Sequence, residues 1–445
     1  MKEKIFVGVD VGGTKILAAL VEQDGEVVSR QKLATPQNAS QKEVILTIQK
    51  CIEELLDKEE IKTSDIDGIG LGVPGIVDEA INEVVNAPNI KLAGAPLVPE
   101  LEKKFGVKIV IGNDVNMGVL GEKWLGAGKE AMDVVGMFMG TGLGGGIVIG
   151  GKMLAGFKGY AAEIGHMIMQ VDGPKCNCGN NGCLEAFVGR WAIERDIREA
   201  MKNGEKTIVC DIAGGKVENI KSKALKEALE KKDGVVTRIM ENVSRVMGFA
   251  CMSLRHIFDL ELIILGGGVM EACGDFILPI VKKVVKSDPY FPEMKEFKIV
   301  ESHLGDDAVF LGAVAYIQQR LGMNPFAPAL KTTVELTKDG ALIINGEKQT
   351  DGVFIRADGK IGDGNRISRV IKGESDIGIK EVKKLCKKNP ELIIVAIDKK
   401  KQFKIDDEAK AFLKESNVEI KLVELNQAIE LYAKTPNRKA LLILS

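Results

Sequence analysis

The chain has 445 residues, of which 45% are hydrophobic, and its 61 basic and 63 acidic side chains leave a net charge of -2. This length predicts about three domains with substantial cores. The balance of charge gives no reason to expect a nucleic acid or a membrane surface as partner. No segment approaches the roughly twenty unbroken apolar residues that a membrane span needs. Three of the eight cysteines crowd one loop and five are scattered, so we expect reduced thiols in a soluble, cytoplasmic protein.

Residues 4–33 contain three apolar runs joined by a Gly-Gly turn and an Asp-Gly turn, which predicts a three-stranded meander. The same order of strand, glycine turn and strand returns at 133–154, so we infer an internal duplication. Between the two meanders we expect alternating helices and strands at 40–59, 66–75, 97–105, 107–114 and 115–125. This alternation predicts α/β layers with parallel strands beside each meander.

The second half of the chain contains helices, a linker and a further small domain. A mostly helical region at 184–256 is followed by an apolar strand at 260–269 and a helix at 308–322. The stretch 322–333 has two prolines and no hydrophobic periodicity, which indicates a linker. Beyond it, a hairpin system followed by alternating helices and strands predicts a second compact α/β domain of a little over a hundred residues.

The run GHMIMQVDGPKCNCGNNGCLE holds one imidazole and three thiols within twenty residues. These four groups are a complete tetrahedral ligand set for zinc and come from His166, Cys176, Cys178 and Cys183. A closed set leaves no open coordination position, so this zinc should shape a loop rather than activate water. The interleaved glycines and asparagines are too polar for a core, which favours a metal site over ordinary buried cysteines.

Two glycine-rich turns could present backbone N–H groups to phosphate oxygens. The candidate residues are, in DVGGTK, Asp10, Gly12, Gly13, Thr14 and Lys15, and in GTGLGGG, Thr141, Gly142, Gly144 and Gly145. Either turn alone is commonly a simple hairpin, but a pair from a duplicated fold can grip a polyphosphate from both sides. Asp10 could also hold a hydrated magnesium ion. In LGGGV, Gly266 and Gly267 could lie against an adenosine or form a plain strand-to-helix turn.

Two other kinds of nucleotide site are excluded. Gly140, Gly142 and Gly145 have the spacing of the dinucleotide fingerprint, but the residues that follow alternate as a strand, whereas the fingerprint opens a helix. Neither glycine turn has the spacing of a Walker loop.

Asn113 and Asp114 end one predicted strand and begin a helix, where catalytic residues of parallel sheets commonly lie. Alone, either residue could be an ordinary helix cap. Beside two phosphate turns, Asp114 becomes the best candidate base, because phosphoryl transfer needs a carboxylate that accepts the proton of the attacking hydroxyl.

The residues that flank the proposed zinc loop suggest a sugar site. Glu163, His166 and Glu185 are interpreted as a polyol clamp, because carboxylates and imidazole can bind vicinal hydroxyls. If one ring nitrogen of His166 binds zinc, the other can contact a sugar hydroxyl. His256 and His303 have no comparable setting and are expected to be structural.

Taken together, these motifs resemble the ROK family of sugar kinases and repressors, over about residues 4–320. The segments that carry the resemblance are DVGGTK, GVPGIVD, GNDVNMGVLGE, GTGLGGG, EIGHM and CNCGNNGCLE. The resemblance implies an actin-like, ribonuclease-H-like ATPase fold whose two lobes close on ATP, magnesium and a hexose. It implies that Asp114 is the general base for the 6-hydroxyl, that the chain forms dimers or tetramers, and that the sugar is lined by Gly75, Asn113, Glu163, His166 and Glu185.

The domain bounds expected from this resemblance are a small lobe at 1–112, a large lobe at 113–322, a linker at 323–337 and a small α/β domain at 338–445. The final helix, near 307–321, could pack back on the small lobe. The last of these domains resembles one of unknown function found alone in archaeal and bacterial proteins, on ING, DGVFIRADGKI and ELIIVAI. That group usually has a glycine turn after the central strand, where this chain has IDKKKQF, and we assign the domain no activity.

Departures from the ROK pattern are few. The usual alanines after the Asn-Asp pair are Val115, Met117 and Gly118 here, which affects packing more than chemistry. Repressor members carry an amino-terminal helix-turn-helix, whereas this chain starts at its first core strand, so we expect no DNA binding. We expect an ATP-dependent hexose kinase acting on glucose. The alternatives are an N-acetylglucosamine or N-acetylmannosamine kinase and a non-catalytic sugar-sensing regulator, against which the intact Asp114 and phosphate turns argue.

Overall fold

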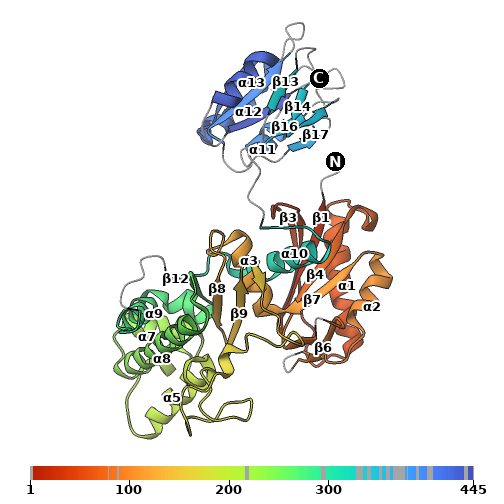
Figure 1. Cartoon of the computed structure of the whole chain (residues 1–445). Coiled ribbons are helices and arrows are strands. Elements are labelled where there is room, and N and C mark those ends of the chain that lie inside the picture. The colour runs from red at the N-terminus through yellow and green to blue at the C-terminus, as the bar shows by residue number, and fades with distance from the viewer. Residues whose placement is uncertain are drawn as a thin grey trace. The chain divides into compact units, whose positions relative to one another are not determined.

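The computed structural model divides the chain into two compact units, Lys4–Phe326 and Ala327–Ser445 (Figure 1). The structure describes residues 4–78, 80–87, 90–215, 220–291, 297–326, 334–337, 342–349, 353–356, 361–363, 376–377, 379–386, 390–397, 404–434 and 439–443. The division falls inside the linker expected at 323–337, of which 327–333 lie outside the described residues. No helix in these ranges is both long enough and apolar enough to cross a membrane.

The first sheet of the larger unit joins an antiparallel meander to two parallel strands, in the order β3-β2-β1-β4-β7. Its strands are β1 (Ile5–Val11), β2 (Lys15–Glu22), β3 (Val27–Ala34), β4 (Gly68–Val73) and β7 (Ile109–Asn113). Helices α1 (Gln41–Lys58) and α2 (Leu97–Phe105) cover one face with an apolar cluster. β1, β2 and β4 are almost wholly apolar because their other face is covered too. A short helix, η1 (Thr63–Asp65), precedes β4, and a hairpin of β5 (Ile76–Asp78) and β6 (Glu83–Asn86) follows it.

The second sheet repeats this plan, in the order β10-β9-β8-β11-β12. Its strands are β8 (Val134–Met139), β9 (Leu143–Ile149), β10 (Lys152–Met153), β11 (Leu262–Gly266) and β12 (Lys298–Glu301). In each sheet the first strand pairs antiparallel with the second and parallel with the fourth, which confirms the predicted duplication. The helices between β10 and β12 are η2 (Ile164–His166), α4 (Glu185–Val188), α5 (Arg190–Lys202), α6 (Val209–Ile212), α7 (Ser222–Glu230), α8 (Gly234–Phe258) and α9 (Gly268–Lys286).

Two helices fill the space between the sheets. α3 (Asp114–Leu125) begins where β7 ends, and η4 (Gly305–Asp307) leads into α10 (Ala308–Arg320), which packs back against β1 and β4 (Figure 1). α3 and α10 approach backbone to backbone, because a Cβ atom on Gly312 would lie only 1.6 Å from the carbonyl oxygen of Met117. Glycine is therefore required at this crossing, which joins the two halves of the larger unit.

We expect Gly312→Ala to destabilise the protein by about 1–3 kcal/mol or more, because the added methyl group meets backbone that cannot move aside cheaply. Urea unfolding followed by circular dichroism measures this change. Gly234→Ala is the matched control, since Gly234 begins α8 with no neighbour within 4 Å. It should leave the stability unchanged or raise it by up to about 1 kcal/mol. Equal unfolding midpoints for the two variants would contradict the role given to Gly312.

The smaller unit contains a mixed sheet in the order β17-β16-β22-β19-β21, in which β19 lies parallel to both of its neighbours. Apolar clusters cover both faces of this sheet. Its elements are β13 (Val334–Leu336), β14 (Leu342–Ile344), β15 (Glu347–Gln349), β16 (Val353–Ile355), β17 (Ile361–Asp363), β18 (Asp376–Ile377), α11 (Ile379–Leu385), β19 (Leu392–Ile397), β20 (Lys404–Ile405), α12 (Asp407–Glu415), β21 (Glu419–Glu424), α13 (Leu425–Lys434) and β22 (Lys439–Ile443). This is the small α/β layering that was predicted. The IDKKKQF segment lies, from 398 on, outside the described residues.

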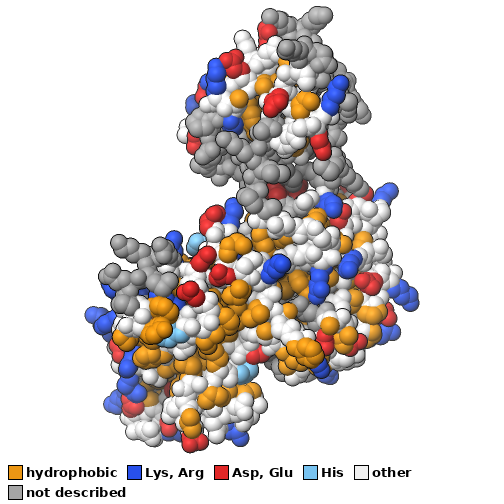
Figure 2. All heavy atoms as spheres, viewed as in Figure 1, with side chains coloured by type: hydrophobic (Ala, Val, Ile, Leu, Met, Phe, Trp, Pro, Cys, Tyr) orange, Lys and Arg blue, Asp and Glu red, His pale blue; other side chains and the backbone are white. Residues whose placement is uncertain are grey.

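Acidic and basic side chains are interspersed on the face of the larger unit seen in Figure 2. This distribution fits the near-zero net charge of the chain.

Candidate functional site

The first glycine turn, Gly12–Thr14, joins β1 to β2. The carbonyl oxygens of this turn accept hydrogen bonds from Thr35 and Gln37. Thr35 donates from Oγ1 to the Gly12 oxygen at 2.6 Å and from its backbone N–H to the Thr14 oxygen at 3.1 Å, and Gln37 donates to the Gly13 oxygen at 2.9 Å. The N–H groups of Gly13 and Thr14 donate to no other group in the described ranges. Two adjacent free amides at a strand end form a ready anion site.

The second glycine turn, Gly140–Gly142, joins β8 to β9 in the same way. The backbone N–H groups of Arg190 and Trp191 donate to the carbonyl oxygens of Gly140 and Thr141, at 3.3 and 3.2 Å. The N–H groups of Thr141 and Gly142 find no acceptor among the described residues. The duplicated fold therefore supplies two turns, each with two amides available to a ligand.

The second turn is shorter than expected. Gly144 and Gly145 were predicted to present exposed amides, but β9 already begins at Leu143, and they pair with Phe138 and Met137 of β8. Gly145 is buried. Their strand pairing removes them from the turn, so the structure corrects their expected position.

The third glycine cluster lies beside the second turn. Gly266 ends β11, and Gly267 caps the start of α9 with a φ angle of +84°. A Cβ atom on Gly267 would lie 2.6 Å from the oxygen of Met139, the residue just before the second turn. The cluster is a strand-to-helix turn.

Asp114 lies where β7 passes into α3. Asn113 caps the helix, since its Oδ1 accepts the N–H groups of Val115 and Asn116 at 2.9 and 3.0 Å. Burial, together with the charge of Glu163, raises the pKa of Asp114 to about 6, although the Val115 N–H opposes the rise. A carboxyl group with this pKa changes charge near neutrality, as a general base requires.

Asp10, at the end of β1, is a second carboxyl group close to Asp114. Burial and the charge of Asp114 raise the pKa of Asp10 to about 7, while Lys15 opposes the rise. Lys15 itself forms an ion pair with Asp306 at 2.6 Å. Two neighbouring, partly buried carboxylates favour a cation between or beside them.

A cavity opens between the start of α3 and the segment that follows β10. Asn113 and Val115, the chain neighbours of Asp114, line it, whereas Asp114 and Asp10 are not among its described lining residues. Its lining includes Gly75, Asn113 and Glu163, three of the predicted sugar residues. Asn113 donates from Nδ2 to the oxygen of Gly75 at 2.9 Å, which fixes the amide at the cavity wall. Gly144 and Gly145 also line this cavity. These two glycines therefore contribute to the wall of the cavity from within β9.

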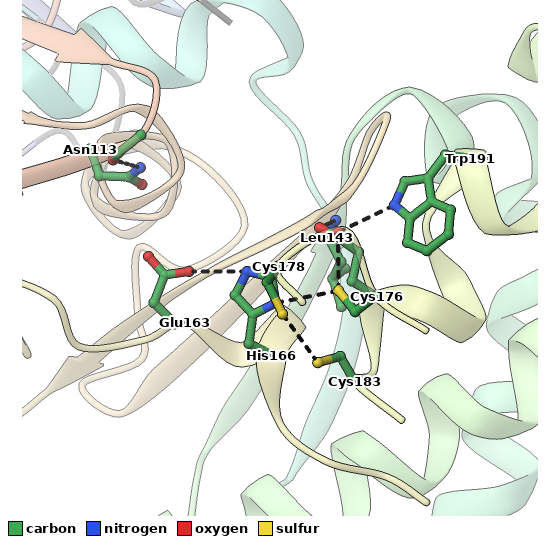
Figure 3. Close-up of polar contacts among 10 residues, drawn as sticks. Asn113, Leu143, Glu163, His166, Cys176, Cys178, Cys183 and Trp191 are labelled. Carbon is green, nitrogen blue, oxygen red and sulfur yellow. Dashed lines mark hydrogen bonds and ion pairs between the residues drawn. The ribbon is translucent and has the colours of Figure 1, made fainter. Parts of the chain in front are cut away.

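The predicted zinc ligands converge on one point (Figure 3). One atom from each of His166, Cys176, Cys178 and Cys183 lies within 4.8 Å of every other. The Sγ atoms of Cys178 and Cys183 are 3.6 Å apart, and His166 Nδ1 lies 3.8 Å from Cys176 Sγ. Tetrahedral zinc with Zn–S distances of about 2.3 Å requires sulfur atoms about 3.8 Å apart, so the donor set fits zinc. His166 turns its other nitrogen, Nε2, toward Glu163 Oε2 at 4.0 Å.

Both carboxylate oxygens of Glu185 accept hydrogen bonds from the chain itself. Its Oε2 accepts the N–H of Leu143 at 2.9 Å, and its Oε1 accepts the indole N–H of Trp191 at 3.2 Å and lies 3.9 Å from Cys176 Sγ. Glu185, like Asp114 and His166, is absent from the described cavity lining. Glu185 thus ties the zinc loop to the second glycine turn, a role that its sequence neighbours did not indicate.

The pattern of the ROK family matches residues 6–320. The chain belongs to the ROK family. Glucokinase from Thermotoga maritima is 36% identical over 319 residues, which cover 71% of this chain and 98% of that protein. The xylose repressor of Caldicellulosiruptor bescii is 30% identical, over 70% of this chain and 77% of the repressor. The structure of a ROK family glucokinase from Streptomyces griseus in complex with glucose and AMPPNP is 31% identical, covers 71% of this chain and 99% of its own, and has a TM-score of 0.61.

These similarities place Lys4–Phe326 in the actin-like ATPase fold, as predicted. ROK relatives include both glucokinases and repressors, so membership alone leaves the activity open. Sequence reasoning missed Tyr160, which lines the cavity, and Arg190 and Trp191, which hold the second glycine turn. The only signal for the last two was that they directly follow the CNCGNNGCLE block and its short helix.

Proposed function

We propose that this ROK protein is an ATP-dependent kinase that phosphorylates the 6-hydroxyl of a hexose, with glucose as the preferred substrate. The observation that carries this proposal is the closeness of Asp10 to Asp114, which stands between the cavity residues Asn113 and Val115, together with two turns that each offer free amides. The similarity to glucokinases at 36% and 32% identity supports it.

In this proposal Asp114 accepts the proton of the 6-hydroxyl as the oxygen attacks the γ-phosphorus of ATP, while the bond from this phosphorus to the β–γ bridging oxygen breaks and ADP leaves. The free amides of Gly13, Thr14, Thr141 and Gly142 bind phosphate oxygens, and Lys15 adds positive charge. Asp10 would hold hydrated magnesium, which supplies charge neutralisation for the phosphates. Its raised pKa fits such a site, because a buried carboxyl group beside another one gains from a neighbouring cation.

The sugar would lie in the cavity against Gly75, Asn113 and Glu163, with His166 Nε2 at its edge. The four His and Cys donors would hold zinc, whose contribution is to order the loop. His166 is then fixed with Nδ1 toward the metal and Nε2 toward the sugar. Glu185 would act on the sugar through this loop rather than from the cavity wall. A cytoplasmic homodimer or homotetramer belongs to the same proposal, and light scattering in solution measures that assembly.

A substrate panel is the first test. Release of ADP should be measured with glucose, mannose, fructose, N-acetylglucosamine and N-acetylmannosamine, and we expect the highest kcat/KM with glucose. A higher value with an N-acetylated sugar would move the preference to hexosamines, because the same clamp can hold hydroxyls common to both. If the protein binds a sugar but phosphorylates none of the five, the kinase proposal is wrong. That result would favour a sugar-sensing regulator, the class suggested by the xylose repressor relative.

A further inference from the structure

The corner between α4 and α5 is pressed against the second glycine turn. A Cβ atom on Gly142 would lie 2.2 Å from Glu185 Oε2, and one on Gly189 would lie 3.3 Å from the Cα atom of Gly142. The first two amides of α5, those of Arg190 and Trp191, donate to the carbonyl oxygens of the turn. The start of a 13-residue helix therefore stands directly behind the two free amides of the turn.

The side chain of Arg190 reaches the ligand-facing part of this turn. Its Nη2 donates to Thr141 Oγ1 at 3.0 Å, and its Nε lies 3.3 Å from Glu194 Oε1 without completing a hydrogen bond. The side chain is 28% exposed, and Nη1 donates to no residue among those described. Since a guanidinium carries five N–H donors in a planar fork, most of its donors remain free for a further acceptor.

We propose that Arg190 binds a phosphate group of the nucleotide held at the second glycine turn. The inference rests on the proposed function, since it assigns a further binding residue to the same site. A phosphate that accepts the Thr141 hydroxyl and the free amides of Thr141 and Gly142 would lie beside the guanidinium, which binds phosphate bidentately.

The negative charges around the site favour a cation such as Arg190. Asp10, Asp114 and Glu163 surround the reaction centre, and Lys15, on the first turn, is already paired with Asp306. A polyphosphate entering this acidic region needs cationic partners on both turns. Arg190 is the cation that contacts the second turn within the described residues.

The test compares Arg190→Met and Arg190→Lys with Arg195→Met in the full-length protein. Arg195 lies on the same helix, but its guanidinium donates to the Ala186 oxygen and packs on the Trp191 ring, so it serves as a control. Calorimetric titration measures binding of AMPPNP and of adenosine. We expect Arg190→Met to weaken AMPPNP about tenfold to a hundredfold with adenosine unchanged, Arg190→Lys to recover part of the loss, and Arg195→Met to change neither.

An unchanged AMPPNP affinity in Arg190→Met would overturn the assignment. An equal loss for adenosine would also overturn it, since that result indicates a purely structural role. Far-ultraviolet circular dichroism checks that each variant is folded. If Arg190→Met does not fold, Arg190→Lys still tests the proposal. AMPPNP binding is measured without sugar, so the two proposals can fail separately. If the wild-type protein binds AMPPNP but phosphorylates no sugar, the kinase proposal is wrong and the test of Arg190 still holds.

Discussion

Asp114→Asn is expected to lower kcat by about a hundredfold or more, because an amide cannot accept the proton of the attacking hydroxyl. The substitution keeps the shape of the side chain, and its Oδ1 can still accept the Val115 N–H that Asp114 accepts at 2.9 Å. Binding of glucose should therefore change little. A coupled assay of ADP release measures kcat, and calorimetric titration of glucose measures the binding separately.

Asp233→Asn is the matched control for this variant. Asp233 also stands at the start of a helix, α8, where its Oδ1 accepts the Val236 N–H at 2.9 Å, but its Oδ2 accepts from Thr207 and Ile208, and none of these residues lines the cavity. We expect kcat to stay within about twofold of wild type, since no proton transfer depends on it. Phosphorylation that survives Asp114→Asn undiminished would show that the base lies elsewhere.

The same carboxyl groups predict the pH dependence of the reaction. Asp114 must be ionised to act as base, and burial raises its pKa to about 6, while the pKa of Asp10 is raised to about 7. As the pH falls through this range both groups take up protons, so kcat/KM should fall between about pH 8 and pH 5. The two charges interact, and the measured pKa values therefore belong to the pair.

Asp10→Asn gives a sharper form of this pH test. The neutral amide removes one negative charge near Asp114, so what activity remains should titrate at lower pH than in the wild type. A rate of the wild type that does not change between pH 5 and pH 8 would exclude these two groups from the reaction.

The fold could be predicted because local patterns and turn residues agreed over long segments. The Gly-Gly turn at Gly12 and Gly13 and the Asp-Gly turn that follows β2 fix a meander, and the repeat of this order predicted the second sheet. The cluster of His166 with three cysteines was predictable for a similar reason. Its four ligands lie close in sequence, so the chemistry of the residues was visible without knowledge of the tertiary structure.

What the sequence could not predict depends on distant packing. Gly144 and Gly145 looked like a turn, but Val115 and Ile164 fill the space where their side chains would lie, at 2.4 and 2.6 Å from the missing Cβ atoms. Glycine is therefore required inside β9 by residues remote in the chain. The hydrogen bond from the Leu143 N–H to Glu185 could not be predicted for the same reason, because 42 positions separate the two residues.

Cys176→Ser is expected to release the zinc, destabilise the larger unit and raise KM for both substrates. Cys176 is buried, with its Sγ 3.8 Å from His166 Nδ1 and 3.9 Å from Glu185 Oε1. Structural zinc contributes about 10–16 kcal/mol in small domains, so loss of one ligand should lower the stability by several kcal/mol and Tm by about ten degrees. Elemental analysis and differential scanning calorimetry measure the two effects.

The KM values for the nucleotide and for the sugar distinguish a metal loop that only stabilises the fold from one that also positions the binding residues. Loss of a bound metal would free His166, whose Nε2 lies 4.0 Å from the cavity residue Glu163, and also Glu185, which holds the start of β9 through the Leu143 N–H. We therefore expect KM to rise for the nucleotide as well as for the sugar. Cys210→Ser, a buried cysteine outside the cluster, should keep its zinc and both KM values. Zinc-free wild-type protein with full activity and stability would refute the metal site, whereas a rise in the sugar KM alone would refute its link to the second glycine turn through Glu185.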